Sequence, residues 1–525
     1  MVNSNFLYLE DKDILYILIY KLGKGSYSTV WYSIEIENFF SKIKNKKILK
    51  LNPRALKIHH DDSYNVGIVE TDINKILIDS NKKKCPYINY PLSYFIYEDI
   101  FVIIVYDVAI GSLYDVMKEF DKKLPINFVY KIIPQLIKPL EFLHKCNYIH
   151  TDIKPENYLL MGTNQIQKDI MEYIIEYKLG EKLKRISNFK KLNVENKIFQ
   201  DVLTKFLVSI SKKFNLSDNI LGSDSYSDTD NDDSVNNNIE NVNTNKDICY
   251  DNEHGDYDLL SIKSFYSNIS DKEKVSDYET VSSYDSRDDE YFEPIDNFHT
   301  DTIIKMIFNL ESQNHNFNNV NDDNNINDEN NKNNIIDLKK ENKLKHLMTM
   351  FANPVVKLTD FGTMVHFNDE KYTIQTRYYR SPEIILGLNY NEKIDLWSLG
   401  CTIYELVTGK ILFYTCKNDL VKNYDVDLIN IKMIIEKISI EEQNKLLKMI
   451  KLSGRKNNFL TKHNYLIFFN KIELNYWKND LVNFFDKSNK DINLIEQNNN
   501  HMYFNYFIKI ITSLLCIEPS ERNFL

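Results

Sequence analysis

The sequence predicts an α+β protein in which one domain is split by a long insertion, with a β-rich part before the insertion and a helical part after it. Short β-branched runs mixed with helical patterns fill residues 14–162, and helical patterns rich in aromatics fill residues 353–525. Between them, residues 163–352 are rich in Asn, Asp and Ser. Such a polar stretch cannot bury enough apolar surface to offset its chain entropy, so we expect most of the insertion to be disordered.

Two parts of the insertion depart from this polar composition. The stretches at 166–186 and 196–214 carry apolar residues at helical spacing. An apolar stripe of this kind is typical of a helix that packs one face on a neighbour. We therefore expect short helices here that dock on the neighbouring domain.

Composition excludes several classes of protein. The 525 residues carry a formal net charge of −10, which argues against a general nucleic-acid binder. The six cysteines include no C-x-x-C pair, so neither a disulfide framework nor a zinc site is indicated, and a reducing intracellular setting is expected. The apolar run from Ile14 to Tyr20 is too short to cross a bilayer and is predicted to be a buried strand.

The first chemical motif is "YKLGKGSYSTVWYS", residues 20–33. Gly23 and Gly25 would let a hairpin backbone close on phosphate oxygens, whereas Ser28 stands where the pattern G-x-G-x-x-G-x-V has its third glycine. A plain turn also explains two glycines. Lys57 follows in an alternating segment, the position of a lysine that bridges the phosphates of a nucleotide.

Such a lysine needs a carboxylate from the following helix. Glu70 and Asp72 are both candidates in "VGIVETDINKILI". The reach of Glu70 is longer, and Ile73 and Leu77 then fall on its helix face, so Glu70 is favoured. The spacing leaves Asp72 open.

The second motif, "YIHTDIKPENYLL", is far more specific. Asp152 is placed to accept the proton of a substrate hydroxyl, Lys154 to neutralise a transferring phosphoryl group, and Asn157 to ligate Mg²⁺. Beyond the insertion, Asp360 begins Asp-Phe-Gly and supplies a second magnesium ligand. Ser381-Pro382-Glu383 follows, and Arg522 is the expected buried partner of Glu383.

Together these strings resemble the eukaryotic protein kinase family over residues 14–162 and 353–525. The finer resemblance is to the SR-protein kinases of the CMGC group, the kinases of serine/arginine-rich splicing factors. It rests on "GKGSYSTVW", "HTDIKPEN", "IQTRYYRSPE" and "FLTKHNYLIFFNKI", together with a long spacer at the same place.

The resemblance implies a bilobal protein-kinase fold, with a small β-rich N-terminal lobe and a larger helical C-terminal lobe. It also implies ATP-dependent phosphorylation of serine or threonine in Arg/Ser-rich or other basic proteins, with ATP and Mg²⁺ as cofactors. Thr376 joins Asp152 and Lys154 as a catalytic residue, and Asn157 and Asp360 hold the metal. The resemblance places the following residues around ATP: Leu22, Gly23, Gly25, Ser26, Ser28, Val30, Ala55, Lys57, Glu70, Tyr106, Asp107 and Ala109. Of these, Tyr106 is the gatekeeper, and Asp107 to Ala109 form the hinge that binds adenine.

We also expect a monomer in the cytoplasm, with entry into the nucleus left open, and no direct contact with nucleic acid or membrane. The sequence stops three residues after Arg522, so the usual closing helix of the C-terminal lobe is expected to be missing.

Thr151 stands where most such loops carry the arginine that holds a phosphate on the activation segment. A threonine offers one neutral hydroxyl in place of a bidentate guanidinium, so a phosphate at Tyr372 or Thr373 would lack its main anchor. We therefore expect an enzyme that is active without phosphorylation of that segment. Two alternatives stay open: a pseudokinase scaffold, and a dual-specificity tyrosine-regulated kinase of the same group.

Overall fold

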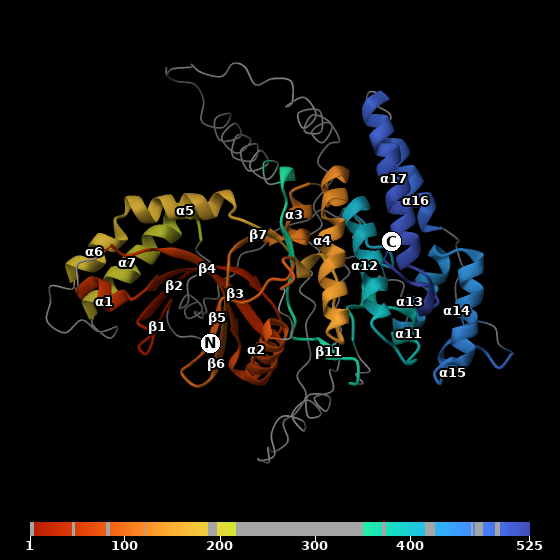
Figure 1. Ribbon diagram of the computed structural model, residues 1–525, viewed down its shortest axis with the longest axis horizontal. Helices are drawn as coiled ribbons and strands as arrows, with labels where there is room; N and C mark the ends of the chain where they lie inside the picture. The colour runs from red at the N-terminus through yellow and green to blue at the C-terminus, as the bar shows by residue number, and fades with distance from the viewer. Residues whose placement is uncertain are drawn as a thin grey trace, which may run out of the picture.

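The computed structural model describes residues 5–44, 48–79, 84–120, 122–186, 197–216, 349, 351–369, 374–414, 426–463, 466–467, 476–488 and 494–524. Figure 1 shows a sheet-rich lobe at one end of the molecule and a helical lobe at the other. The predicted α+β organisation is confirmed.

The N-terminal lobe is built on an antiparallel six-stranded sheet of order β1-β2-β3-β4-β6-β5. Its strands are β1 (Phe6–Leu9), β2 (Ile14–Lys24), β3 (Ser28–Glu37), β4 (Asn52–His59), β5 (Ser93–Tyr97) and β6 (Phe101–Tyr106). The apolar run at Ile14 to Tyr20 is a buried strand, as predicted. Helix α2 (Tyr64–Asp79) packs on β4 and β6, and α1 (Phe39–Lys44) follows β3.

Both faces of this sheet are buried. Successive side chains of a strand point to opposite faces, so one strand can serve two cores. On β2, Tyr16 and Leu18 join a core with Trp31 and Phe101 on one face. The intervening residues point the other way, into a core with side chains of the insertion.

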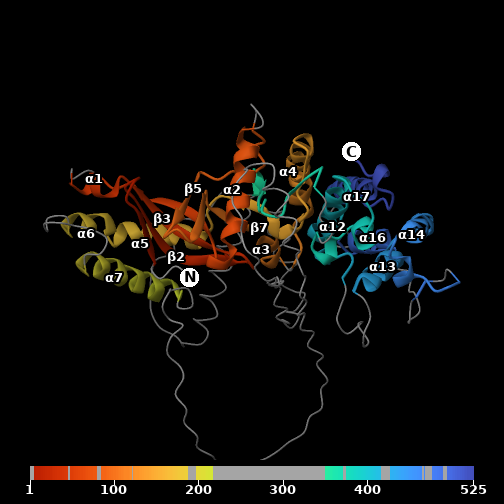
Figure 2. The ribbon, with the colours of Figure 1, turned by 90° about the horizontal axis from the view of Figure 1, so that it is seen from below.

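The described part of the insertion supplies that second core. Helices α5 (Gln165–Glu176), α6 (Leu179–Ile186) and α7 (Lys197–Phe214) lie against the β2–β3 end of the sheet (Figures 1 and 2). Phe199 and Phe206 of α7 are fully buried against it. The helices expected at 166–186 and 196–214 therefore exist and dock on the N-terminal lobe, with Lys178 in a left-handed conformation (φ 55°) between α5 and α6.

Residues 217–348 of the insertion lie outside the described residues, and with them most of the segment for which we predicted disorder.

Short strands join the two sides of the insertion. Strand β9 (Tyr158–Met161) follows the D-x-K-P-E-N motif and pairs with β10 (Val356–Leu358), which precedes Asp360. Strand β8 (Tyr148–Ile149) pairs with β11 (Val365–His366). The residues of the two motifs, far apart in the chain, are thereby brought to one place. Strand β7 (Ala109–Ser112) completes the sheet on β9.

The C-terminal lobe is built around α4 (Ile126–Lys145) and α12 (Lys393–Thr408). Every residue of α12 from Ile394 to Thr408 is buried, the pattern of a central core helix. Gly409 ends α12 with φ 73°, and a Cβ there would lie 2.9 Å from the Lys122 carbonyl oxygen, so the turn requires glycine. The remaining helices are α3 (Leu113–Lys118), α11 (Pro382–Ile385), α13 (Val426–Lys437), α14 (Ile440–Leu452), α15 (Lys456–Phe459), α16 (Trp477–Ser488) and α17 (Leu494–Leu514).

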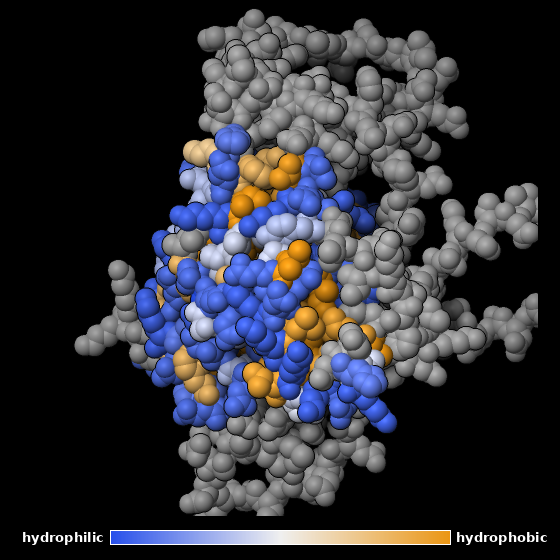
Figure 3. Space-filling model, turned by 90° about the vertical axis from the view of Figure 1, so that its right-hand side faces the viewer, coloured by the Kyte–Doolittle hydropathy of each residue, from blue (hydrophilic) through white to orange (hydrophobic). Residues whose placement is uncertain are grey.

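The outer end of this lobe is a mostly hydrophilic surface with some apolar side chains between the charged ones (Figure 3). Exposed Ile440 and Leu452 lie on α14, Val482 on α16 and Met502 on α17. Among the described helices, none combines the length and apolar character that crossing a membrane requires.

Candidate active site

The Gly-containing hairpin between β2 and β3 closes with a hydrogen bond from the Gly25 amide to the Ser28 carbonyl oxygen, at 2.8 Å. A Cβ on Gly23 would meet no atom within 4 Å, and one on Gly25 would lie 3.7 Å from that same oxygen. Packing within the protein therefore does not require either glycine. Both positions are exposed, which is compatible with the phosphate-binding prediction. Ser26 is exposed at the tip, whereas Ser28 is buried.

Beneath the hairpin lies a small apolar cluster. Ala55, Ile104 and Tyr106 are buried together, and Leu22 and Val30 pack against them. Four of these five side chains, all except Ile104, are residues that the resemblance placed around ATP. The fold brings them together from four different strands.

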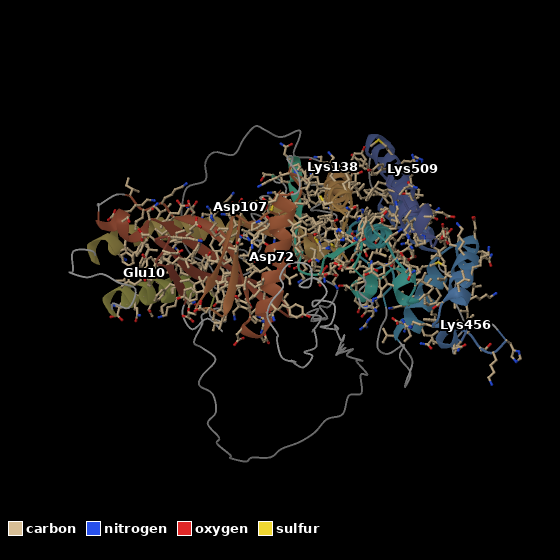
Figure 4. The ribbon with its side chains drawn as sticks, turned by 60° about the horizontal axis from the view of Figure 1, so that its bottom comes forward. Glu10, Asp72, Asp107, Lys138, Lys456 and Lys509 are labelled. Carbon is tan, nitrogen blue, oxygen red and sulfur yellow. The ribbon has the colours of Figure 1, made fainter. Side chains whose placement is uncertain are left out.

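Lys57 on β4 lies between two carboxylates. Its Nζ donates to Glu70 Oε1 and Oε2 at 2.8 and 2.7 Å, and to Asp360 Oδ1 at 2.8 Å. Asp72 instead accepts from Lys75 at 2.8 Å, on the outer side of α2 (Figure 4). The sequence left open whether Glu70 or Asp72 pairs with Lys57. In the structure the partner is Glu70.

The charges of this trio support one another. The Lys57 ammonium lowers the pKa of Asp360 to about 2. Burial alone would lower the pKa of Lys57, but Asp360 and then Glu70 raise it above its ordinary value. Burial alone would raise the pKa of Glu70, but the Lys57 charge lowers it. All three side chains are therefore ionised at neutral pH.

The hinge, Asp107 to Ala109, contacts the insertion in a way that the sequence did not reveal. Asp107 is half exposed and lies 3.5 Å from Arg54. Ala109 begins β7, and its carbonyl oxygen accepts a 3.1 Å hydrogen bond from Gln167 Nε2 of α5. Gln167 is fully buried, so the insertion reaches the hinge backbone itself. No local pattern at Gln167 signals this contact.

Asp395, at the start of α12, fixes the backbone of the catalytic loop. Its carboxylate accepts the backbone amides of His150 and Thr151 at 2.8 and 2.9 Å. Thr151 has φ 71°, a costly conformation for a β-branched residue, and these hydrogen bonds maintain it. Its hydroxyl donates to the Thr363 carbonyl oxygen at 2.9 Å, and the residue is only 1% exposed.

Asp152 is the centre of a connected polar group. Its Oδ1 accepts from Thr376 Oγ1 at 2.6 Å, and its Oδ2 lies 3.0 Å from both Lys154 Nζ and Asn157 Nδ2. Lys154 also donates to Thr376 Oγ1 at 3.0 Å. Burial acts to raise the pKa of Asp152, but the Lys154 charge and the Thr376 hydrogen bond outweigh it, and the net pKa is lowered. The carboxylate is thus ionised and able to accept a proton.

Asn157 and Asp360 offer an amide and a carboxylate oxygen, the hard ligands that Mg²⁺ prefers. No group of three or more His, Cys, Asp or Glu side chains suited to a metal occurs within the described part of the chain. Mg²⁺ usually keeps several waters and takes further oxygens from substrate phosphates, so it can be held by two protein ligands. The donor chemistry present therefore suits the expected ion.

The segment after Asp360 is anchored to the helical lobe. Residues 370–373, with the two candidate phosphorylation sites Tyr372 and Thr373, lie outside the described residues. Gln375 binds Ser398 and Ser381, and Arg380 donates to the Gln375 carbonyl oxygen at 3.1 Å. Glu383 and Arg522 form a fully buried bidentate pair at 2.6 and 2.8 Å, as expected.

Two family models match the chain, one over its N-terminal part and one over its C-terminal part. The model for protein tyrosine and serine/threonine kinases matches residues 17–171, and the model for the protein kinase domain matches residues 331–523. The fold and the paired lysine and carboxylates agree with both. The chain carries a protein kinase domain in two parts.

The similar proteins narrow the class. The mimivirus protein L205 from Acanthamoeba polyphaga mimivirus, which bears the name of a serine/threonine-protein kinase, is 28% identical over 413 residues, 76% of this chain and 68% of that protein. Dual specificity tyrosine-phosphorylation-regulated kinase 2 of Drosophila melanogaster is 49% identical over 78 residues, 15% of this chain and 10% of that protein. Serine/threonine-protein kinase SRPK of Physarum polycephalum is 42% identical over 87 residues, 16% of this chain and 19% of that protein. The chain belongs to the serine/threonine protein kinases and has relatives in the CMGC group.

Proposed function

We propose that this kinase transfers the γ-phosphoryl group of ATP to serine in Arg/Ser-rich or other basic proteins. The single observation that carries the proposal is the connected group around Asp152, assembled next to the complete Lys57–Glu70–Asp360 trio. A pseudokinase would tolerate loss of one of these groups, but each is present with a charged partner. This favours turnover over the scaffold alternative.

The residues divide the chemistry between them. Asp152 Oδ1, which accepts from Thr376 Oγ1, is the atom that would orient and deprotonate the substrate hydroxyl. Lys154 carries positive charge beside it, where charge develops on the transferring group. Lys57, fixed by Glu70, would hold the nucleotide phosphates, and bound Mg²⁺ on Asp360 and Asn157 would neutralise their charge.

A basic substrate is supported by the acidic chain, with its net charge of −10, and by the SR-kinase-like motifs. Its test is radiolabelled ATP with an Arg/Ser-repeat peptide and a myelin-type basic protein. We expect kcat/KM for the repeat peptide to be at least about tenfold higher, about 1.4 kcal/mol of discrimination. Equal use of both substrates would contradict the Arg/Ser preference. Use of a tyrosine-containing peptide would favour the dual-specificity alternative.

The proposal includes activity without phosphorylation of the activation segment. Thr151 supports it, because its buried hydroxyl is already donated to Thr363 and offers nothing to a phosphate. Phosphatase-treated enzyme, checked by intact mass, is expected to keep its activity within about twofold, since no phosphate contact is lost. A loss of most activity that returns on rephosphorylation would overturn this part of the proposal.

A further inference from the structure

The residue His59, two positions after Lys57 on β4, has no role in the mechanism above. Side chains two apart on a strand share a face, so Lys57 and His59 both point toward α2. The His59 Nε2 lies 3.2 Å from Glu70 Oε2, the oxygen that Lys57 binds at 2.7 Å. Both His59 and Glu70 are only 1% exposed.

The His59 ring is a buried polar group without another use. Within the described residues, neither ring nitrogen forms a hydrogen bond of good alignment, and Glu70 is the charged group that Nε2 faces. Burying an imidazole among apolar groups is costly, whereas a contact with a buried carboxylate offsets part of that cost. The position therefore favours a histidine that interacts with Glu70 over a histidine that only fills space.

Helix α2 leaves room for this ring. Gly67 lies one turn before Glu70 on the same side of the helix. A Cβ at Gly67 would lie 2.8 and 2.9 Å from His59 Cγ and Cδ2, and 2.7 Å from Val102 Cβ. The absence of a side chain at Gly67 allows His59 to lie between α2 and β6 and to reach the carboxylate.

Tyr106 adds a third contact on the opposite oxygen. Its hydroxyl lies 3.5 Å from Glu70 Oε1, and the residue is buried. The Glu70 carboxylate is thus surrounded by Lys57, His59 and Tyr106 inside the N-terminal lobe. A carboxylate with donors on several sides has little freedom to leave its position.

We propose that His59 is a positioning residue that fixes Glu70, and through it α2, in the orientation that Lys57 needs for binding ATP. This deepens the proposed function and rests on it. The His59–Glu70 contact orders α2 from inside the N-terminal lobe. In other kinases, a phosphate on the activation segment supplies that order. A neutral imidazole with its proton on Nε2 can make this polar contact, so no change of protonation is required.

The test compares three variants of the full chain. His59→Leu introduces an apolar side chain of similar size and removes both ring nitrogens, whereas His59→Gln keeps a side-chain N–H donor. His60→Leu is the matched control, because the His60 Nε2 faces Thr29 Oγ1 at 3.1 Å and not Glu70. For each, kcat and KM for ATP are measured on the repeat peptide, with affinity for a fluorescent ATP analogue and the thermal unfolding midpoint.

We expect His59→Leu to lower kcat/KM for ATP about tenfold and to weaken binding of the analogue, with an unfolding midpoint close to that of the wild type. His59→Gln should recover most of both losses, and His60→Leu should stay within about twofold of the wild type. Wild-type values for His59→Leu, or equal losses in His59→Leu and His59→Gln with a lowered midpoint, would overturn the inference.

Different results would contradict the proposed function and the inference about His59. A wild-type chain that binds the analogue but transfers no phosphate would defeat the proposed function, while the binding comparison among the variants would still test His59. An inactive dephosphorylated wild type would defeat the regulatory part whatever His59 does.

Discussion

Asp152→Asn is expected to lower kcat by about 10²- to 10⁴-fold, with little change in KM for ATP. The amide is close in shape to the carboxylate but cannot accept the proton of the substrate hydroxyl. The partly buried neighbours Lys154 and Thr376 also lose their ionised partner. Phosphate incorporation into the repeat peptide, measured beside ATP-analogue affinity, separates the chemical step from binding.

The control for this prediction is the unfolding midpoint, which should change little because the side chain keeps its volume. Retention of more than about a tenth of the wild-type kcat would contradict the role of Asp152 as the proton acceptor. Another group would then have to accept the proton of the substrate hydroxyl.

Arg522→Leu is expected to lower the free energy of unfolding by about 3–5 kcal/mol. It leaves the Glu383 carboxylate buried without its bidentate partner, whose two bonds measure 2.6 and 2.8 Å. It also removes hydrogen bonds to the carbonyl oxygens of Cys516, Ile517 and Lys393. Urea unfolding, monitored by tryptophan fluorescence, measures the loss.

Two further variants isolate the cause. Glu521→Gln removes a neighbouring surface pair with Lys445, where Glu521 is 45% exposed, and should cost only about 0–1 kcal/mol. The double change Glu383→Leu with Arg522→Leu should be less destabilised than Arg522→Leu alone, because no unpaired charge remains. An Arg522→Leu protein as stable as Glu521→Gln would contradict the assigned role of the buried pair.

Local motifs were enough to identify the chemical groups of the site. Asp152, Lys154 and Asn157 lie within six residues, so their relative placement depends on one loop whose sequence is specific. Asp360 and the alternating strand around Lys57 were found in the same way. The burial of Arg522 with Glu383, 139 residues away, was expected from the kinase motifs, since a charge buried in an apolar lobe needs a partner.

Packing decided what local patterns left open. Glu70 and Asp72 are two residues apart and lie on roughly opposite sides of a helix of 3.6 residues per turn, so only the orientation of α2 on β4 selects Glu70. His59 carried a usable signal, because a polar residue two positions after Lys57 must share its face. Its partner and the space left by Gly67 belong to a different element and were not visible.

The sequence by itself determined that this chain is a kinase, and it predicted which side chains carry phosphoryl transfer, because both inferences depend on short, dense motifs. Only the tertiary structure decided that α5–α7 cover the β2–β3 face, that Gln167 reaches the hinge at Ala109, and that the Thr151 hydroxyl is spent on Thr363. The physical reason is the same in each case. An apolar stripe or a polar side chain predicts that it will be buried or paired, but its partner is chosen by contacts between distant segments.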